Sequence, residues 1–420
     1  MNLVERWDSA PIVGKGAWLR GNLVGAIHIG VLGAGMSLPG ARDLAAAVGI
    51  SRGTVDAVYT QLTDEGFLRQ AARHRPTVVG TRGVRPPVLT APSSALPPPT
   101  PGVPDASLFP HRAWAAASRA ALNRIAARDL GYPDPSGHPV VRAALASWLT
   151  RTRGVSVAPD DIHVTDGVSH ALWLLADVLD APVWALERPG AAGARHILGH
   201  VVECLPTRVD AAGLVPGEIP AAAATVLLTP GHQYPTGTVM PAGRRRAVVD
   251  ACRTVGRWLV EDDFDSHLAE PGVVPAAMQA LAPDGIILVG SLSKLLAPGL
   301  RMGWIVAPPD VIEQLRDLRQ STDLGGSVTT QLTVAELISS GELDRHLRRA
   351  RREYRLRRER LAAALAPRWT VSGAPVGVYA FVPTDTPDDL IDQLADRNVP
   401  STVVDDPDWA GVVVSVAAFR

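Results

Sequence analysis

The stretch GSLSKLLAPGLRMG, residues 290–303, surrounds one lysine with groups that suit a phosphate-bearing ligand. These groups are two hydroxyls and a guanidinium, from Ser291, Ser293 and Arg301. The lysine, Lys294, is one of only two in the chain, although Lys and Arg together number 41. Only an amine that can lose its proton forms a Schiff base with an aldehyde, which an arginine does not do. We therefore assign chemistry to Lys294 and none to the other lysine, Lys15.

Short apolar runs alternate with helical patterns on both sides of this stretch. The runs are residues 162–165, 183–186, 225–228, 258–260 and 286–289. Such alternation predicts an α/β fold with a mainly parallel sheet, whose ligand site lies at the carboxyl ends of the strands. Gly167, Asp262 and Ser291 each follow one of these runs, so we expect them at the same edge of the sheet.

The first 80 residues carry a different pattern, that of two short helices followed by a hairpin. Pro39 suits the start of a helix that Gly49 ends, and Ser51 is a good N-cap for a second helix. The apolar positions at helical spacing are Leu44, Ala45, Val48, Val55, Val58, Tyr59 and Leu62. Residues 67–70 and 77–79 then have the pattern of two strands joined by a basic tip. This layout predicts a winged helix-turn-helix.

The second of these helices presents polar residues at its N-terminus, where backbone N–H groups and the helix dipole attract phosphate. The candidate DNA contacts are Arg42, Ser51, Arg52, Thr54 and the tip residues Arg73 and Arg75. In this hypothesis Arg52 reaches a guanine edge or a phosphate. A second interpretation stays open, in which the segment is a small helical interaction domain whose arginines only face solvent.

Residues 19–79 resemble the winged helix of GntR-type regulators, which implies double-stranded DNA as a partner. The matching positions are Leu38-Pro39, Arg42, Leu44-Ala45, Ser51-Arg52, Thr54-Val55, Tyr59, Leu62 and Glu65-Gly66-Phe67-Leu68. Gly40 and Ala41 stand where that family usually has two serines. We expect the loss of these hydroxyl contacts to phosphate to weaken DNA binding without redirecting it.

A proline-rich stretch divides the chain. Residues 81–105 contain eight prolines, a composition that predicts an extended, semi-rigid linker. We therefore expect a DNA-binding domain at residues 1–80, the linker at 81–105 and a large effector domain at 106–420. Ten basic and six acidic residues occur through Arg85, so the N-terminal part is positive although the whole chain carries a net charge of −1.

The lysine stretch resembles the lysine motif of fold-type I pyridoxal phosphate (PLP) proteins. The string TPGHQYPTG, residues 229–237, is similar to the loop that runs beside the cofactor in aminotransferases. Together with the N-terminal segment and the linker, these motifs make nearly the whole chain similar to the MocR subfamily of bacterial transcription regulators.

The resemblance implies a fold-type I aminotransferase-like domain with a smaller C-terminal subdomain, and PLP held as an aldimine on Lys294. Asp262 then pairs with the pyridinium nitrogen, although it also suits a simple helix cap. The other cofactor-binding candidates are Ser291, Ser293, Arg301, Gly167 and Tyr234. The family further implies a homodimer with exchanged heads and an effector, either an amine or PLP itself. The arginine-rich residues from 341 to 349 fit the family as well, either as a solvated helix or as a DNA or dimer contact.

Three positions depart from the family pattern. Ala191 replaces an aromatic residue that stacks on the pyridine ring, and Phe264 replaces a tyrosine that hydrogen-bonds the ring hydroxyl. Each loss is worth about 0.5–1.5 kcal/mol, which puts the affinity for PLP in question, although covalent capture by Lys294 can outweigh both. Val413 stands where an arginine is expected to hold a substrate carboxylate, and a bidentate clamp is hard to replace. An ordinary α-amino acid is therefore not the expected ligand.

Two functions follow from these features. The favoured one is a transcription regulator whose degenerate aminotransferase-like domain senses PLP or a PLP-reactive amine. The alternative is a PLP-dependent aminotransferase, or another PLP enzyme, with a relic or dimerising N-terminal head.

Cys204 and Cys252 are the only cysteines, which leaves no disulfide framework and no metal-ligand spacing, so no metal is expected. No apolar run approaches the roughly 18 residues of a membrane span, and we expect a cytoplasmic chain.

Overall fold

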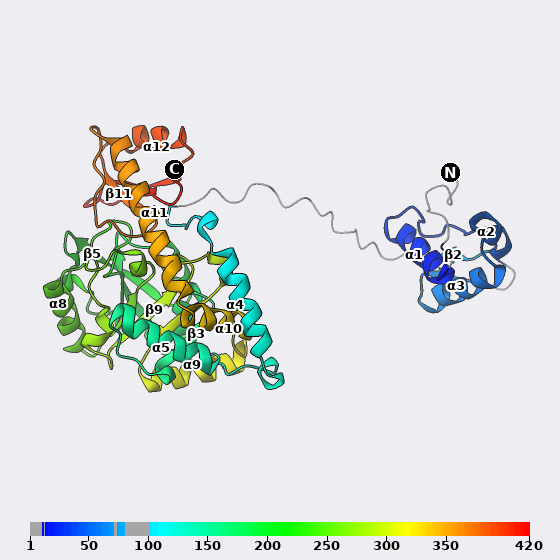
Figure 1. Ribbon diagram of the computed structural model, residues 1–420, viewed down its shortest axis with the longest axis horizontal. Coiled ribbons are helices and arrows are strands. Elements are labelled where there is room, and N and C mark those ends of the chain that lie inside the picture. Colours follow the sequence, from blue (N-terminus) through cyan, green and yellow to red (C-terminus); the bar gives the residue numbers. More distant parts are fainter. Residues whose placement is uncertain (1–10, 12, 71–73, 80–100) are drawn as a thin grey trace. The chain divides into compact units, whose positions relative to one another are not determined.

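The computed structural model describes residues 11, 13–70, 74–79 and 101–420. The chain forms two compact units, Met1–Pro97 and Pro98–Arg420 (Figure 1). Arg73 and most of the predicted linker, residues 81–100, lie outside the described residues. Within the described ranges, every helix is too short or too polar to cross a lipid bilayer.

The N-terminal unit contains three helices and a two-stranded wing. They are α1 (Lys15–His28), α2 (Ala41–Val48), α3 (Arg52–Asp64), β1 (Leu68–Arg69) and β2 (Thr77–Val78). Gly49 ends α2 with a φ of 69°, which glycine adopts without strain. The Ser51 hydroxyl caps α3 by accepting a hydrogen bond from the Thr54 N–H at 3.1 Å. The small core includes Leu19, Leu23, Leu38, Leu44, Val55 and Leu62. The predicted winged helix-turn-helix is confirmed.

The C-terminal unit is an α/β fold, as predicted. Its helices are α4 (His111–Arg124), α5 (Pro139–Arg153), α6 (Val168–Val178), α7 (Ala192–Leu198), α8 (Ala242–Arg253), α9 (Pro309–Thr322), α10 (Val328–Ser339), α11 (Glu342–Leu365) and α12 (Pro387–Ala395). The strands of its large sheet are β3 (Ile162–Thr165), β4 (Val183–Arg188), β5 (Glu203–Asp210), β6 (Gly213–Leu214), β7 (Thr225–Leu228), β8 (Trp258–Asp262), β9 (Ile286–Ser291) and β10 (Gly303–Val306).

The large sheet has the order β3-β10-β9-β8-β7-β4-β5-β6 and is mainly parallel. The antiparallel pairs are those of β10 with β3 and with β9, and that of β6 with β5. Helices cover both faces: Leu172 of α6 and Leu315 of α9 share one cluster with Ile287, and Val248 of α8 shares another with Leu259. Burial on both faces explains why the predicted strands are continuous apolar runs rather than alternating ones. The carboxyl ends of β3, β4, β7, β8 and β9 meet at one edge of the sheet.

A smaller subdomain follows at the C-terminus. Its antiparallel sheet has the order β11 (Tyr379–Pro383), β13 (Gly411–Ser415), β12 (Ser401–Val404), and α12 packs on it. The long helix α11 leads from the large part of the unit to this subdomain (orange in Figure 1). The expected division into a large and a smaller part is therefore confirmed.

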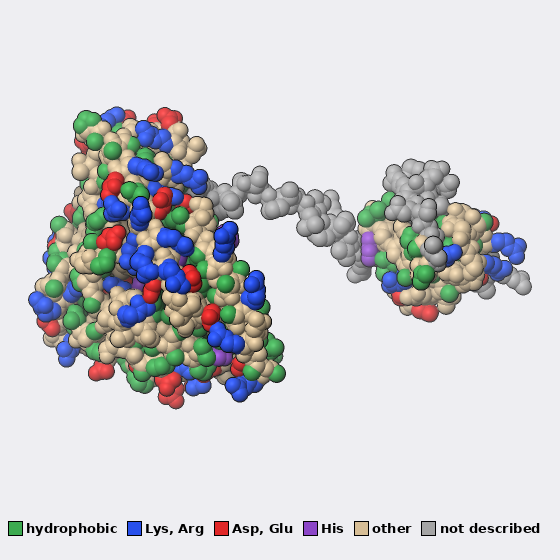
Figure 2. Space-filling model, viewed as in Figure 1, with side chains coloured by type: hydrophobic (Ala, Val, Ile, Leu, Met, Phe, Trp, Pro, Cys, Tyr) green, Lys and Arg blue, Asp and Glu red, His purple; other side chains and the backbone are tan. Residues whose placement is uncertain are grey.

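Helix α11 includes most of the arginine-rich run from residue 341 to 349. Its inner side buries Leu343, Leu347, Tyr354 and Leu361. Its outer side carries the exposed arginines Arg345, Arg348, Arg349, Arg352 and Arg355, and Figure 2 shows basic side chains gathered over this helix. A DNA or dimer contact by this surface stays a prediction.

Candidate functional site

The strand ends of the C-terminal unit line a pocket of about 470 Å³. Its walls include Asp262, Ser291, Ser293, Lys294, Arg301 and Tyr234, which are the cofactor-binding candidates other than Gly167. Gly167 borders the pocket through Arg301, because a Cβ added at Gly167 would lie 3.3 Å from Arg301 Nη1. Residues up to 134 positions apart in the sequence, Gly167 to Arg301, are thus brought to one edge of the sheet.

One end of the pocket brings together groups whose charge and N–H donors suit an anion. Helix α6 begins here, and its unpaired backbone N–H groups and dipole favour negative charge. Val168 and Ser169 of its first turn line the pocket together with Arg301. Gly303 is needed for this arrangement, since a Cβ there would lie only 2.8 Å from Gly167 Cα. We call Gly167, the first turn of α6, Ser291, Ser293 and Arg301 the anion cradle.

Arg301 reaches the cradle from an unusual backbone conformation. Its φ is 47°, in the left-handed region that residues other than glycine rarely occupy. Such conformations occur mostly where the surrounding structure enforces them, and they cluster at functional sites. The conformation of Arg301 is thus a second sign, besides the pocket, that this segment binds a ligand.

Lys294 projects into the pocket without a hydrogen bond or ion pair to any described residue. Burial lowers the pKa of its amine, and the nearby carboxylates of Asp265 and Asp262 oppose this effect only in part. A larger fraction of the amine is therefore uncharged, which is the form that attacks a carbonyl carbon. Gly102, from the end of the predicted linker, lies beside it: a Cβ at Gly102 would be 4.0 Å from Lys294 Nζ.

Two buried carboxyl groups lie beneath the pocket. Burial, aided by the charges of Asp263 and Asp265, raises the pKa of Asp262 to about 8, and its Oδ1 is buried without a hydrogen-bond partner in the described chain. Burial also raises the pKa of Glu187 to about 7. Both residues line a second, smaller cavity next to Ala191. An unpartnered buried oxygen is costly, so Asp262 is suited to a cationic or N–H donor group.

Our sequence analysis did not select Glu187. Its Oε2 accepts hydrogen bonds from the Thr229 N–H at 3.1 Å, from the Thr229 hydroxyl at 2.6 Å and from Gln233. Glu187 therefore fastens the loop after β7 to the end of β4. A charged residue at the end of an otherwise apolar strand was the available signal, but the sequence does not disclose that its side chain is buried.

A second pair that our sequence analysis missed supports the floor of the pocket. His232 Nδ1 lies 2.9 Å from Asp265 Oδ2, and both side chains are almost fully buried. Tyr379 stacks on His232 with ring centroids 4.5 Å apart, and its hydroxyl donates to the Gln233 carbonyl at 2.8 Å. These residues come from two parts of the unit, so β11 of the smaller subdomain completes the pocket.

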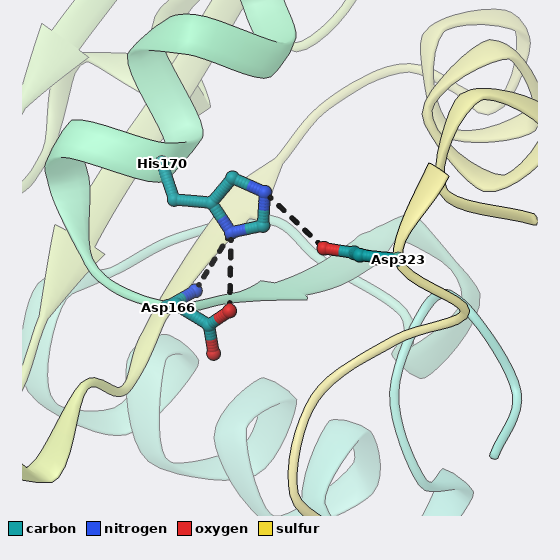
Figure 3. A group of neighbouring side chains, drawn as sticks. All are labelled: Asp166, His170 and Asp323. Atoms are coloured by element: carbon teal, nitrogen blue, oxygen red, sulfur yellow. Dashed lines mark hydrogen bonds and ion pairs between the residues drawn. The ribbon is translucent and has the colours of Figure 1, made fainter. Parts of the chain in front are cut away.

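Asp166, His170 and Asp323 form the only group in the described ranges whose spacing suits a metal ion (Figure 3). His170 Nδ1 accepts a hydrogen bond from the Asp166 N–H at 3.1 Å, and its Nε2 faces Asp323 Oδ2 at 3.6 Å. Asp323, however, already pairs through both oxygens with the buried guanidinium of Arg319, at 2.8 and 3.0 Å. Its charge is neutralised, so the group is better explained as a link that holds the Asp166–Gly167 turn of the anion cradle.

The three departures from the family pattern all lie at or behind this pocket. Ala191 and Phe264 line it directly. Val413 is buried on β13 in one cluster with Tyr379 and Phe381, against which Tyr234 and Phe264 pack. No arginine other than Arg301 lines the pocket among the residues that the structure describes.

The candidate DNA contacts in the N-terminal unit lie mostly at the surface. Arg42, Ser51, Arg52 and Arg75 are exposed, and Thr54 is partly buried. Arg52 pairs with Asp56 one helical turn later at 3.3 Å, so this weak pair must open before Arg52 contacts DNA. Arg75 lies 3.6 Å from Asp43, whereas Arg42 makes no ion pair with the described residues.

Two protein families match the sequence of this chain. Residues 19–79 match the bacterial regulatory proteins of the gntR family, and residues 104–404 match the aminotransferase class I and II family. The match to the aminotransferase family therefore begins near the end of the predicted linker.

The chain is also similar to full-length regulators. The HTH-type pyridoxine biosynthesis transcriptional regulator PdxR of Corynebacterium glutamicum is 35% identical, over 89% of this chain and 84% of that protein. The probable rhizopine catabolism regulatory protein MocR of Rhizobium meliloti is 31% identical, over 81% of this chain and 75% of that protein.

Solved aminotransferase structures share the fold of the C-terminal unit. An archaeal alanine:glyoxylate aminotransferase superposes with a TM-score of 0.67 at 20% identity, covering 76% of this chain and 85% of that one. The kynurenine aminotransferase of Pyrococcus horikoshii gives a TM-score of 0.66 at 23% identity with the same coverage.

Burial of Glu187 predicts a pH-dependent stability. Its pKa is about 7 in the folded chain and near 4.3 in an unfolded one, so the folded chain holds the extra proton between these values. The free energy of unfolding that Glu187 contributes therefore falls as pH rises from 4 to 7. Glu187→Gln has no such proton to lose. The free energy of unfolding of the variant relative to wild type, both free of PLP, should therefore rise by about 2 kcal/mol from pH 5 to pH 8.

Denaturant unfolding at both pH values measures this gain. Glu203→Gln, at an exposed position of β5, is the matched control and should differ equally from wild type at both pH values. An equal difference for Glu187→Gln at pH 5 and pH 8 would contradict the raised pKa.

Proposed function

This chain belongs to the MocR subfamily of GntR-type transcription regulators, and from that premise we propose that it binds PLP at Lys294 and reports the state of this pocket to DNA. The observation that carries the proposal is the position of Lys294, whose buried amine shares one pocket with the anion cradle and with Asp262. The aminotransferase class I and II fold implies PLP dependence. The covalent attachment and the residue roles below are our proposal.

The residues of the pocket fit PLP part by part. When bound, PLP supplies a phosphate, an aldehyde that an amine captures, and a ring that withdraws electrons. The anion cradle would hold the phosphate, with Arg301 as its cation and Ser291 and Ser293 as hydroxyl donors. The unpartnered Oδ1 of Asp262 would hold the ring nitrogen. Lys294 would capture the aldehyde, because burial keeps part of its amine uncharged.

Other parts of the pocket hold a ring less firmly. Ala191 offers no aromatic face, and Phe264 offers no hydroxyl donor. Tyr234 lines the pocket, and burial raises the pKa of its hydroxyl, which therefore stays protonated and able to donate. We assign Tyr234 the contact to the ring hydroxyl that Phe264 no longer makes. The pocket is thus suited to reversible occupancy more than to permanent retention.

A physical route leads from the pocket toward the linker. Pro101 and Gly102 line the pocket next to Lys294. A few residues later the chain is fixed: Asp105 pairs with the buried Arg357 of α11 at 2.8 Å, and its N–H donates to the Tyr354 hydroxyl at 3.1 Å. Because Asp105 fixes the chain on the C-terminal side of Pro101 and Gly102, a ligand that displaces these two residues would move the chain on their N-terminal side, which is the linker. In a homodimer with exchanged heads, which the family resemblance implies, this displacement changes the spacing of the paired heads.

Two effectors are compatible with this device, a PLP-reactive amine and PLP itself. The relative from Corynebacterium glutamicum is named as a transcriptional regulator of pyridoxine biosynthesis, and pyridoxine is the vitamin to which PLP is chemically related. Enzymatic turnover is the alternative activity, and the retained pair of Asp262 and Lys294 favours it. Val413 and Ala191 oppose it, because transamination needs both a clamped carboxylate and a firmly held ring. We therefore propose sensing, with little or no turnover of common α-amino acids.

The assignment of Lys294 is tested by absorbance. Protein incubated with PLP and then freed of excess PLP should show a visible band, and borohydride reduction should attach the phosphopyridoxyl mass to the peptide that contains Lys294. Lys294→Ala and Lys294→Arg should both abolish the band, because neither side chain forms an imine. Lys15→Ala removes the other lysine and should keep it. An undiminished band in Lys294→Ala would contradict the assignment.

The DNA contacts are tested on a sequence enriched from random or genomic DNA by the purified full-length protein. Because each phosphate contact releases counterions, removing one should lower the slope of log affinity against log salt by about 0.9. Arg42→Ala should do so and weaken all sequences alike. Arg52→Ala should cost about 1–3 kcal/mol for the enriched sequence if Arg52 reads a base.

Arg253→Ala is the matched control, because Arg253 is an exposed arginine on α8 of the other unit. It should leave both the slope and the affinity unchanged. Failure of the protein to enrich any sequence at low salt would favour the enzyme alternative.

A further inference from the structure

One wall of the pocket beside Lys294 is formed mainly by small residues. Helix α7 begins there, and the side chains that it offers are a methyl group or nothing at successive positions: Ala191, Ala192, Gly193 and Ala194. A Cβ added at Gly193 would meet no atom within 4 Å, and Ala192 and Gly193 are exposed, so the pocket opens to solvent at this wall while Ala191 and Ala194 are half-buried. Ile197 from the next turn and Leu172 of α6 close the wall with apolar surface. We call these six residues the apolar recess.

The other side of the pocket is aromatic. Tyr234, Phe264 and Tyr379 all line it, and the rings of Tyr234 and Tyr379 meet edge to face with centroids 5.1 Å apart. The Tyr379 hydroxyl is engaged with the Gln233 carbonyl at 2.8 Å, so this residue presents ring surface more than a polar group. Val413 backs the aromatic side and is 1% exposed. A ligand body between these walls meets mainly apolar surface.

Positive charge is confined to one end of this space. Within the described ranges, the pocket contains two cationic side chains, Lys294 and Arg301, and Arg301 belongs to the anion cradle. Arg358 of α11 lies near Tyr379 but donates its hydrogen bonds to the carbonyls of Tyr379, Ser372 and Gly373. A carboxylate that left water against these apolar walls would find no cationic partner besides Lys294 and Arg301 among the described lining residues, which is unfavourable.

We propose that the ligand read by this pocket is a primary amine with a ring-bearing apolar body and no carboxylate. This inference rests on the proposed function, in which PLP is bound through Lys294. An incoming primary amine would form the C=N bond to the aldehyde carbon of PLP as the bond to Lys294 Nζ breaks, which returns Lys294 to a free amine. The amine is recognised by the PLP-loaded Lys294 site, the ring by the apolar recess and the facing aromatic residues. A ligand ring takes the space that the missing aromatic side chain at position 191 leaves open. Specificity thus follows from the departures at Ala191 and Val413, which oppose ordinary amino acids.

Four probe compounds separate the two parts of this proposal. Phenethylamine and ethylamine differ by one phenyl ring, and L-phenylalanine and L-alanine are the same two amines with an α-carboxylate added. Full-length protein is loaded with PLP, freed of the excess, and titrated with each compound at pH 8 while its absorbance spectrum is recorded. Burying a phenyl group favours binding by roughly 1.5–3 kcal/mol, which is a factor of about 10–150. Phenethylamine should therefore bind at least tenfold more tightly than each of the other three.

A substitution in the recess provides an independent check. Ala191→Tyr fills the space and should reduce the ratio between phenethylamine and ethylamine to near one. Ala191→Ser adds little volume and is the matched control, which should keep the ratio. Should Ala191→Tyr fail to fold, the four-compound comparison on the wild-type chain still decides the question.

Several outcomes would overturn the inference. L-phenylalanine binding as tightly as phenethylamine would show that a carboxylate is accepted, and ethylamine binding equally well would remove the role of the recess. A PLP band on Lys294 that no amine changes would overturn this inference while leaving PLP as the effector. Absence of the band itself would overturn the proposed function, and the inference with it.

Discussion

Lys294 and Asp262 share one pocket in which both side chains are largely buried, and the ends of the parallel strands hold them there. Burial lowers the pKa of the Lys294 amine and raises that of the Asp262 carboxyl, so both move toward their neutral forms. Two such groups are held together only by a rigid frame, here the ends of parallel strands that helices cover on both faces. The close approach of Gly303 to Gly167 lets the anion cradle form at the same edge of the sheet. A ligand with a phosphate, an aldehyde and a ring nitrogen would offer a partner to the anion cradle, to Lys294 and to Asp262 respectively.

The same pocket has lost the groups that fix a ring and a carboxylate, at Ala191, Phe264 and Val413. In the proposed function these losses would leave covalent capture and phosphate binding intact but loosen the geometry that rapid turnover needs. For a sensor this is an advantage, because a pocket that exchanges its ligand can follow ligand concentration. The position of Gly102 then matters as much as that of Lys294, since the chain beside the amine is also the end of the linker. In the proposed function, recognition and transmission would therefore occur at neighbouring atoms.

Much of this arrangement could be predicted from the sequence, because it depends on local patterns. The apolar runs predicted the strands, and the polar residues that follow them predicted the edge at which Asp262, Ser291 and Lys294 meet. Contacts between distant segments could not be predicted. Nothing in the sequence indicates that Glu187 bonds to Thr229, that Arg319 neutralises Asp323, or that Tyr379 of the smaller subdomain covers the pocket. Such contacts depend on tertiary packing, which brings together side chains far apart in the chain.

Coupling between the pocket and DNA is the central claim, and one measurement tests it most directly. The affinity of the full-length protein for its enriched DNA sequence is measured at fixed salt, with and without saturating PLP, for wild type and for Lys294→Ala. Coupling free energies between sites are typically about 1–3 kcal/mol, so PLP should change the wild-type affinity by about fivefold or more. Lys294→Ala should bind DNA but show no such response. Equal affinity of the wild type with and without PLP, or an undiminished response in Lys294→Ala, would contradict the account.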